Sequence, residues 1–382
     1  MATLAARQLI DSAVPAFSTI RSWILRLGYA ELTRPLDRTQ RWFRLIDHTI
    51  QVGDRKSLVI LGGSLDRVAF GPRPLARDDP RLVALVPMTR SNGDAVERQL
   101  EVAASRTGVP RLIVSDQGSD LAKGIRGYAE WRPEVAHVAD AAHVGANLLK
   151  ASWESQPAWS RFLRKLQETA TEPRQSSCAE LTAPRLRPKG RFLNPEVQLR
   201  FVRMLLTRWD DPNPDPRVVE HYGWLREYRA AVTEWLAEHE WVRRTVGHLR
   251  RHGLHRGTQR ELNGVWKGVG IRGRAGLRSL ARSWCGYVKR YRPRAAGDRY
   301  VTSTEVLESS FGTLKRLARQ QSDSGLTGLV LAMGMIVGTR SEERMRASLD
   351  ATPRKVVDRW RETWLGKTIQ WLRRRLLAKP TT

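Results

Sequence analysis

The chain has 382 residues, of which 41% are hydrophobic, and it carries a formal net charge of +27. Regular apolar runs at this hydrophobic fraction exclude a disordered chain, and no run approaches the ~18 apolar residues that a membrane-spanning helix needs. Because so large a positive charge repels itself unless a polyanion neutralises it, we expect nucleic acid as the partner class, with an anionic membrane surface as the alternative.

The cysteines and the first residues bear on location. Only Cys178 and Cys285 occur, far apart, which excludes a disulfide framework and a cysteine-based zinc site. Residues 1–16 lack the charged-then-apolar layout of an export signal, and no lipidation signal favours the membrane alternative. We therefore expect a cytoplasmic, nucleoid-associated protein in a reducing compartment, without a membrane partner.

The first half of the chain alternates between strand-like and helix-like patterns. Residues 1–40 predict a short helical arm, and residues 41–90 predict three strands that form an antiparallel meander. Further strands are predicted at 111–115 and 135–139, each followed by a helix, and these two strands would join the sheet in parallel through helical crossovers. This order is that of the ribonuclease-H-like fold, an α/β fold with a mixed five-stranded sheet and flanking helices.

Beyond residue 153 the strand-like runs disappear. Residues 154–300 predict an all-helical insertion domain, and eight of the fourteen tryptophans lie between Trp153 and Trp284. Most of these would form helix-packing core. Trp266 differs because it lies in a glycine-rich basic stretch over 264–270, where an indole could stack on an unpaired base at ~1–3 kcal/mol.

The last part of the chain returns to the core and ends in a basic helix. Thr302 and Glu305 fit a capping box that would start a helix with a buried stripe including Leu307 and Phe311. Residues 326–338 predict an apolar core helix. The predicted domains are the arm (1–40), the first part of the core (41–153), the insertion (154–300), the last part of the core (301–345) and the basic C-terminal helix (346–382).

Aspartates follow or lie within three of the predicted strands. Asp47 lies within the first strand, Asp116 ends the fourth, and Asp140 follows the fifth. A carboxylate at the carboxyl end of a buried strand lies at the sheet rim, where α/β folds bind ligands, although Asp116 alone is equally well explained as a helix N-cap. Carboxylates of this kind hold Mg²⁺ or Mn²⁺ in phosphodiester chemistry.

Four short motifs in this order resemble the DDE transposases of bacterial insertion sequences, in the branch related to mutator-like and hAT-like elements. They are Asp47, Asp116, Asp140-Ala141-Ala142-His143 and Glu308-Ser309, and the resemblance covers roughly residues 41–340. It implies Asp47, Asp116 and Glu308 as catalytic ligands of two Mg²⁺ ions, for which Mn²⁺ can substitute, and Asp140 and His143 as auxiliary residues.

The resemblance also implies an activity. The enzyme would hydrolyse a phosphodiester at a transposon end and transfer the freed strand to target DNA, as a homodimer or larger assembly on DNA. A ribonuclease-H-like nuclease without strand transfer and an inactive, transposase-derived DNA-binding protein remain alternatives. The family's N-terminal DNA-reading domain exceeds forty residues, so we expect recognition by the insertion and tail, or a compact or truncated version.

Some residues compete with the implied set. Glu305 competes with Glu308 but is accounted for by the capping box, and Asp120 competes with Asp116 but lies one turn into the following helix. His48 would point to the opposite sheet face as a packing or supporting residue. His248, His252 and His255 have spacing that could suggest zinc but favour a basic, DNA-facing helix end. The predicted DNA-binding residues are Arg250, Arg251, His252, Arg256, Trp266, Lys267, Arg272, Arg274, Lys315, Arg316, Arg373 and Arg374.

Overall fold

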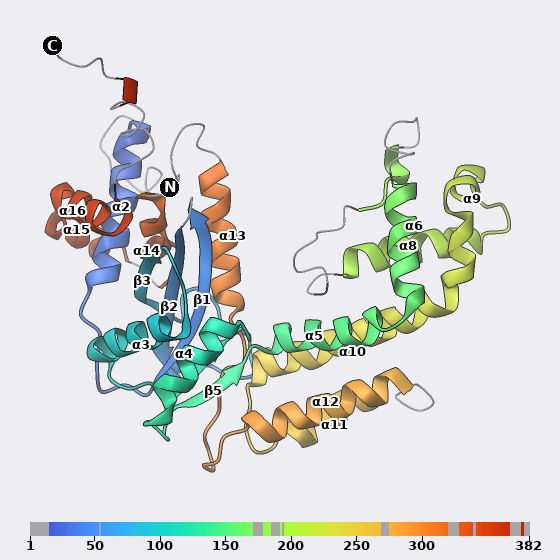
Figure 1. Cartoon of the computed structure of the whole chain (residues 1–382), viewed down its shortest axis with the longest axis horizontal. Helices are drawn as coiled ribbons and strands as arrows, with labels where there is room; N and C mark the ends of the chain where they lie inside the picture. The colour runs from blue at the N-terminus through green and yellow to red at the C-terminus, as the bar shows by residue number, and fades with distance from the viewer. Residues whose placement is uncertain are drawn as a thin grey trace. The chain divides into compact units, whose positions relative to one another are not determined.

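The protein forms two compact units. The computed structural model describes residues 15–52, 55–170, 179–184, 192, 195–268, 275–319, 328–338, 341–366 and 376–377. The first unit joins Met1–Ala69, Arg73–Val138 and Ser303–Thr382, and the second joins Phe70–Pro72 and Ala139–Thr302. Figure 1 labels the elements of both units. None of the described helices is both long enough and apolar enough to cross a membrane.

The first unit is built on a five-stranded sheet with the order β3-β2-β1-β4-β5. Strand β2 is antiparallel to β1 and β3, and β4 is parallel to β1, so β1, β3 and β4 run in one direction. This is the predicted ribonuclease-H-like arrangement, and the fold class is confirmed. The strands are β1 (Trp42–Val52), β2 (Arg55–Ser64), β3 (Arg81–Met88), β4 (Leu112–Ser115) and β5 (Ala136–Ala139).

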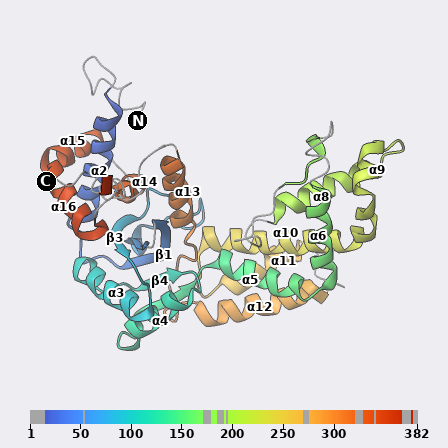
Figure 2. The ribbon, with the colours of Figure 1, turned by 45° about the horizontal axis from the view of Figure 1, so that its top comes forward.

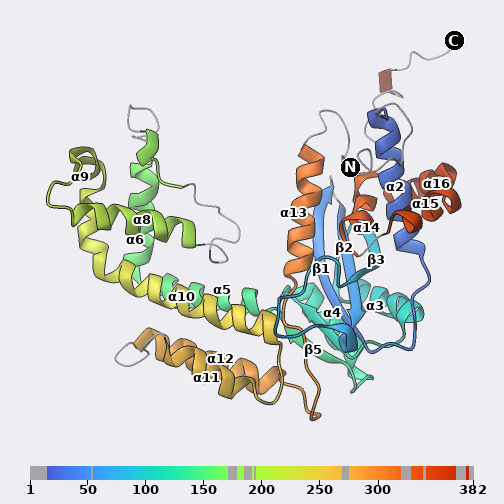
Figure 3. The same cartoon turned by 180° about the vertical axis from the view of Figure 1, so that it is seen from behind.

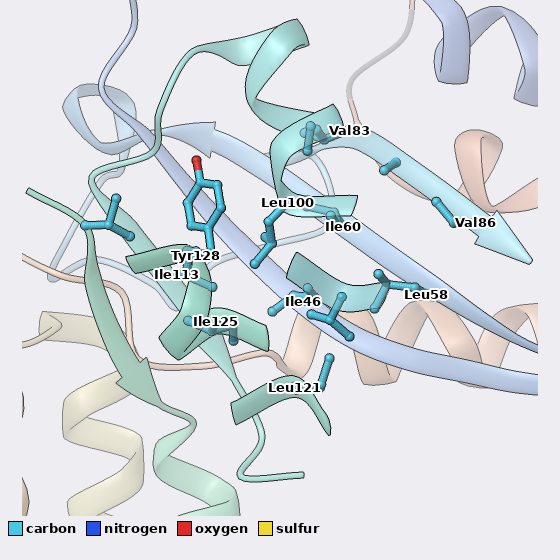
Figure 4. Close-up of a cluster of buried hydrophobic side chains, with 14 of the residues drawn as sticks. Ile46, Leu58, Ile60, Val83, Val86, Leu100, Ile113, Leu121, Ile125 and Tyr128 are labelled. Atoms are coloured by element: carbon cyan, nitrogen blue, oxygen red, sulfur yellow. The ribbon is translucent and has the colours of Figure 1, made fainter. Parts of the chain in front are cut away.

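Two helices, α3 (Gly93–Thr107) and α4 (Ser119–Glu130), cover one face of the sheet. Figure 4 shows the hydrophobic cluster between these helices and the sheet, in which strand residues such as Ile46 and Ile60 contact helix residues such as Leu100 and Ile125. All four side chains are fully buried, and each such side chain contributes about 1.5–3 kcal/mol to folding.

A buried arginine ties β1 to α3 on that face. The Arg44 guanidinium donates hydrogen bonds to Leu100 O at 3.1 Å and Thr107 Oγ1 at 2.8 Å. Burial lowers the pKa of Arg44 to about 10, so the side chain stays charged at neutral pH. Helix α3 begins after Asn92, whose side chain caps the helix by accepting from Ala95 N at 2.8 Å.

Helix α13 (Glu305–Arg319) packs against β1, and Figures 1 and 3 show it alongside that strand from two sides. Side chains alternate along a strand, so Leu45 and Asp47 point away from the face that carries Ile46. None of the α13 residues belongs to the α3–α4 cluster, which places α13 on the other face. Its predicted stripe of Leu307, Phe311 and Leu314 is buried.

The remaining helices of the first unit pack around α2 (Phe17–Thr33). A Cβ atom on Gly28 would lie 1.9 Å from Leu331 O, so only glycine allows this approach of two backbones. A single apolar helix was predicted over 326–338. Its described residues form a 3₁₀ segment followed by one short helix, and residues 326 and 327 lie outside the described part. The elements that pack on α2 are η4 (Gly328–Ala332), α14 (Met333–Ile336), α15 (Glu342–Ala351) and α16 (Arg354–Leu365), and a single 3₁₀ turn, η1 (Leu65–Arg67), follows β2.

The regular elements in the described part of the second unit are helices, apart from the last residue of β5 and one isolated bridge between Leu254 and Tyr300. The 24-residue helix α10 is its spine, and Figure 2 shows α5, α11 and α12 along it. The unit begins at Ala139 because α5 packs on α10 and α12, whereas the insertion was predicted from residue 154. Its elements are α5 (Ala141–Glu154), α6 (Pro157–Thr169), η2 (Ala179–Leu181), α8 (Glu196–Trp209), α9 (Pro216–Tyr222), η3 (Gly223–Tyr228), α10 (Arg229–His252), α11 (Thr258–Lys267) and α12 (Ala275–Tyr291).

Tryptophans form much of this unit's core. The ring centroids of Trp153 and Trp159 lie 4.7 Å apart, as do those of Trp159 and Trp235. Trp153 Nε1 donates to Glu238 Oε2 at 2.6 Å, which gives a buried indole its hydrogen-bond acceptor. Burial raises the pKa of Glu238 above the ordinary glutamate value.

Candidate functional site

Two aspartates lie side by side on neighbouring parallel strands. The β1–β4 ladder ends with Ile46 opposite Ser115, and Asp47 and Asp116 each follow by one residue. Neighbouring strands are about 4.8 Å apart, so the two residues are adjacent although they are distant in the sequence. Both are half-buried. The sheet therefore places the backbones of the first two predicted acids next to each other.

A backbone amide holds each of these carboxylates. Asp47 Oδ1 accepts from His48 N at 2.6 Å, and Asp116 Oδ1 accepts from Gly118 N at 3.1 Å. The N-cap residue of α4 is Gly118, so Asp116 is not the helix cap. Its carboxylate instead closes a local turn just before the helix, which fixes its orientation.

On the α3–α4 face, three polar residues form a cluster, called here the Ser91 cluster: His48, Ser91 and Asp120. The Ser91 hydroxyl lies 2.7 Å from His48 Nε2 and donates to Asp120 Oδ2 at 2.7 Å. Burial lowers the pKa of His48. Burial acts to raise the pKa of Asp120, but the Ser91 hydrogen bond and the His48 ring together lower it, so Asp120 is a carboxylate at neutral pH.

The Ser91 cluster does not have the geometry of a hydrolase triad. In a triad the carboxylate holds the imidazole, and the serine gives its proton to that imidazole. Here the serine proton goes to Asp120, and His48 Nδ1 lies 3.7 Å from Asp120 Oδ2. The cluster instead ties the peptide next to Asp47 to the first turn of α4. Asp120 is therefore hydrogen-bonded within the Ser91 cluster. His48 lies on the opposite face of the sheet from Asp47, as predicted.

Glu308 lies on α13 and is half-buried. The residue after it is fixed by Arg77, whose guanidinium donates to Ser309 Oγ at 3.2 Å and to Ser309 O at 2.9 Å. The predicted capping box of Thr302 and Glu305 is wrong, because α13 begins at Glu305. The Thr302 hydroxyl donates to a carbonyl oxygen at 3.0 Å, that of Leu249.

The aspartate pair suits a hard cation, because Mg²⁺ and Mn²⁺ prefer carboxylate oxygens. Within the described ranges, however, no three His, Cys, Asp or Glu side chains form a group that could hold a metal ion. The described residues therefore do not form the predicted three-acid metal site, and this metal site stays a prediction. Membership of Glu308 stays a prediction.

Asp140 and His143 belong to the second unit. Asp140 is 1% exposed and caps α5, where its Oδ1 accepts from His143 N at 2.8 Å. The same oxygen lies 3.1 Å from His143 Nδ1. This capping contact explains the Asp-x-x-His spacing structurally, and the auxiliary catalytic role stays a prediction.

Trp266 corrects one of the predicted DNA contacts. It lies in helix α11 rather than a loop, and it is 4% exposed. Its ring stacks on Trp241 with centroids 4.9 Å apart, and Nε1 donates to Thr245 Oγ1 at 2.9 Å. No base can stack on a ring that is covered in this way. The helical spacing of Leu262 and Trp266 was the signal that the neighbouring glycines obscured.

The histidine cluster at the end of α10 includes an acid. Glu261 Oε2 lies 2.9 Å from His248 Nε2 and 3.2 Å from His255 Nε2, and His248 stacks on His252 with ring centroids 4.5 Å apart. These contacts join the end of α10 to α11. Of the other predicted DNA contacts, Arg251, Arg256, Lys267, Lys315 and Arg316 are exposed, whereas Arg250 and His252 are half-buried. Arg272, Arg274, Arg373 and Arg374 lie outside the described residues.

The Ser91 cluster was not predicted. Ser91 lies 43 residues from His48 and 29 residues from Asp120 in the sequence. Because both partners are distant in the sequence, only the folded structure shows that Ser91 contacts them.

No family model matches the sequence, and no curated protein matches it. Among solved structures, the chain is similar to the Drosophila P element transposase strand transfer complex, with a TM-score of 0.39 and 10% identity. The match covers 86% of this chain and 86% of that chain. A likeness at this TM-score and identity does not establish a shared activity.

Proposed function

We propose that this protein is a DDE-type DNA transposase of a bacterial insertion sequence. The observation that carries the proposal is the position of Asp47 in β1 and of Asp116 directly after β4, each following the last paired residue of two neighbouring parallel strands in a ribonuclease-H-like sheet. Helix α13, which bears Glu308, packs against the same strand. The net charge of +27 supports DNA as the substrate.

Asp47, Asp116 and Glu308 would hold two Mg²⁺ ions, whose chemistry there would be activation of the attacking oxygen and stabilisation of the leaving one. The backbone amides of His48 and Gly118 orient the two aspartates. Asp140 and His143 would support the site as auxiliary residues.

The exposed basic side chains would bind DNA through its phosphates, independently of sequence. Three of these side chains are exposed on regular helices: Lys267 on α11, and Lys315 and Arg316 on α13. The reaction would first hydrolyse a phosphodiester at the transposon end. The freed 3′-hydroxyl would then attack a phosphodiester of the target DNA, in a homodimer or larger assembly that holds both ends.

Strand cleavage and strand transfer on a transposon-end substrate with Mg²⁺ test this proposal. Asp47→Asn, Asp116→Asn and Glu308→Gln should abolish both steps while leaving salt-sensitive DNA binding intact. Glu305→Gln is the matched comparison on the same helix, because Glu305 is exposed and no longer has the capping role that accounted for it. It should retain cleavage, whereas loss of cleavage in Glu305→Gln but not in Glu308→Gln would make Glu305 the third acid. Normal activity after Asp116→Asn would show that Asp116 is not a catalytic residue.

The same assay separates the alternatives. Cleavage without a joined product would indicate a ribonuclease-H-like nuclease. Salt-sensitive binding without metal-dependent cleavage would indicate a transposase-derived DNA-binding protein.

A further inference from the structure

A cavity of about 390 Å³ lies in the first unit, at the end of strand β3. Its lining comes from three segments: the end of β3 with the residues that follow, one face of α3, and the end of α16. The polar and aromatic side chains among the lining residues are Thr89, Arg90, Arg98, Gln99, Thr363 and Trp364.

Local structure explains how these side chains meet. Strand β3 stands at the end of the sheet, and its pairing with β2 ends at Met88, so the chain leaves the sheet at Thr89. Ala95, Arg98 and Gln99 share one face of α3 because they are three and four residues apart. Helix α16 packs against β3 and brings its penultimate residue, Trp364, to the opening.

The cavity has the electrostatics of an anion site. Arg90 and Arg98 are exposed, and within the described part of the chain neither guanidinium has a hydrogen-bonded or ion-paired partner. The described lining residues include no acid. A cleft lined by charges of one sign concentrates its potential and attracts the opposite charge.

The cavity also presents an aromatic surface. Trp364 is 41% exposed and lines the cavity beside the two arginines. Every nucleobase has a flat face that stacks on an indole, and arginine binds phosphate through paired N–H groups. The volume is at the lower end of the range for small-molecule sites, about 300–1,000 Å³.

We propose that this cavity binds one nucleotide, with its base against Trp364 and its phosphate between Arg90 and Arg98. Thr89 and Gln99 supply donors and acceptors for the base edge or sugar. The nucleotide can be an unpaired nucleotide of a DNA strand or a free nucleotide, since both offer the same chemistry. The proposal does not depend on Asp47, Asp116 or any catalytic activity.

Binding of adenosine monophosphate to the full chain, measured by calorimetry, is the first test. Trp364→Ala should weaken binding by about 5- to 150-fold, and Trp364→Phe should restore most of it because a stacking face remains. Trp131→Ala is the matched control, since Trp131 is 82% exposed and lies outside the cavity. It should leave the affinity unchanged.

A phosphate test separates charge from stacking. Arg90→Ala with Arg98→Ala should weaken binding of adenosine monophosphate but leave that of adenosine nearly unchanged. Arg111→Ala with Arg126→Ala removes two other exposed arginines and should change neither. Competition by a single-stranded oligonucleotide would identify DNA as the source, and its failure to compete would identify a free nucleotide.

The proposal is overturned if neither adenosine monophosphate nor the oligonucleotide loses affinity on Trp364→Ala. It is also overturned if the two arginine pairs behave alike. Unchanged thermal unfolding of each variant shows that a loss of binding is local.

Discussion

Ser91→Ala gives a direct test of how the carboxylate pair is supported. The substitution removes the hydroxyl that lies 2.7 Å from both His48 Nε2 and Asp120 Oδ2. His48 provides the amide that holds Asp47, and Asp120 lies in the helix that follows Asp116. The substitution therefore removes the hydrogen bonds that link His48, next to Asp47, to helix α4, and it changes neither proposed ligand.

The expected loss can be worked from the two hydrogen bonds. A bond to a charged acceptor contributes about 1.5–3 kcal/mol, and a neutral one about 0.5–1.5 kcal/mol. The side chains of His48 and Asp120 are 14% and 24% exposed, so water replaces the lost partner only in part. We expect Ser91→Ala to lower the free energy of unfolding of the first unit by about 2 kcal/mol.

Hydrogen exchange of the β1 and β4 amides in the full chain measures this loss in the first unit alone. Ser91→Thr keeps the hydroxyl and is the control, with exchange close to that of the parent. A double-mutant cycle with Asp120→Ala should give a coupling free energy of about 1 kcal/mol or more. Strictly additive effects, or unchanged exchange in Ser91→Ala, would refute the reasoning.

Three further substitutions test other parts of the structure. Burial raises the pKa of Glu238, so the folded state is favoured when this carboxyl is protonated. That contribution to stability is complete below the ordinary value of 4.5 and is lost as the pH rises through the raised pKa. Glu238→Gln keeps the acceptor for Trp153 and should raise stability at neutral pH, measured by thermal unfolding from about pH 4 to 8. Trp266→Ala should lower the free energy of unfolding by about 3–5 kcal/mol, measured by denaturant unfolding. Trp266→Phe, once shown to fold, should bind an oligonucleotide as tightly as the parent protein. Gly28→Ala should lower the melting temperature because the new Cβ would meet Leu331 O at 1.9 Å. The control Gly247→Ala, where a Cβ meets nothing within 4 Å, should stabilise α10 by about 0.5–1 kcal/mol.

The sheet and its two aspartates were predictable because their signals are local. The apolar run Leu112–Ser115 predicts a buried strand without any knowledge of its neighbours, and Asp116 follows as its end. Strand order then follows from general rules of connection, which place β1 beside β4 and Asp47 beside Asp116.

The features that the sequence could not provide all depend on distant partners. Threonine is a common helix-capping residue, but the Thr302 hydroxyl donates to the carbonyl oxygen of Leu249, 53 residues away. Trp266 is flanked by glycines that suggested a loop, yet Trp241 covers its ring. The cavity draws Arg90, Arg98 and Trp364 from three elements, so no single stretch of sequence reveals it.

The position of β3 has a consequence for how copies of the protein can associate. An unprotected edge strand offers a row of amides and carbonyls to a second sheet. Here Pro87 removes one donor from β3, and α2, α14 and α16 pack against the strand. At the other end of the order, β5 has only four residues. Two copies of the protein would therefore meet through helical surfaces rather than by extending one sheet into the next, and the covered β3 and short β5 limit strand-mediated aggregation.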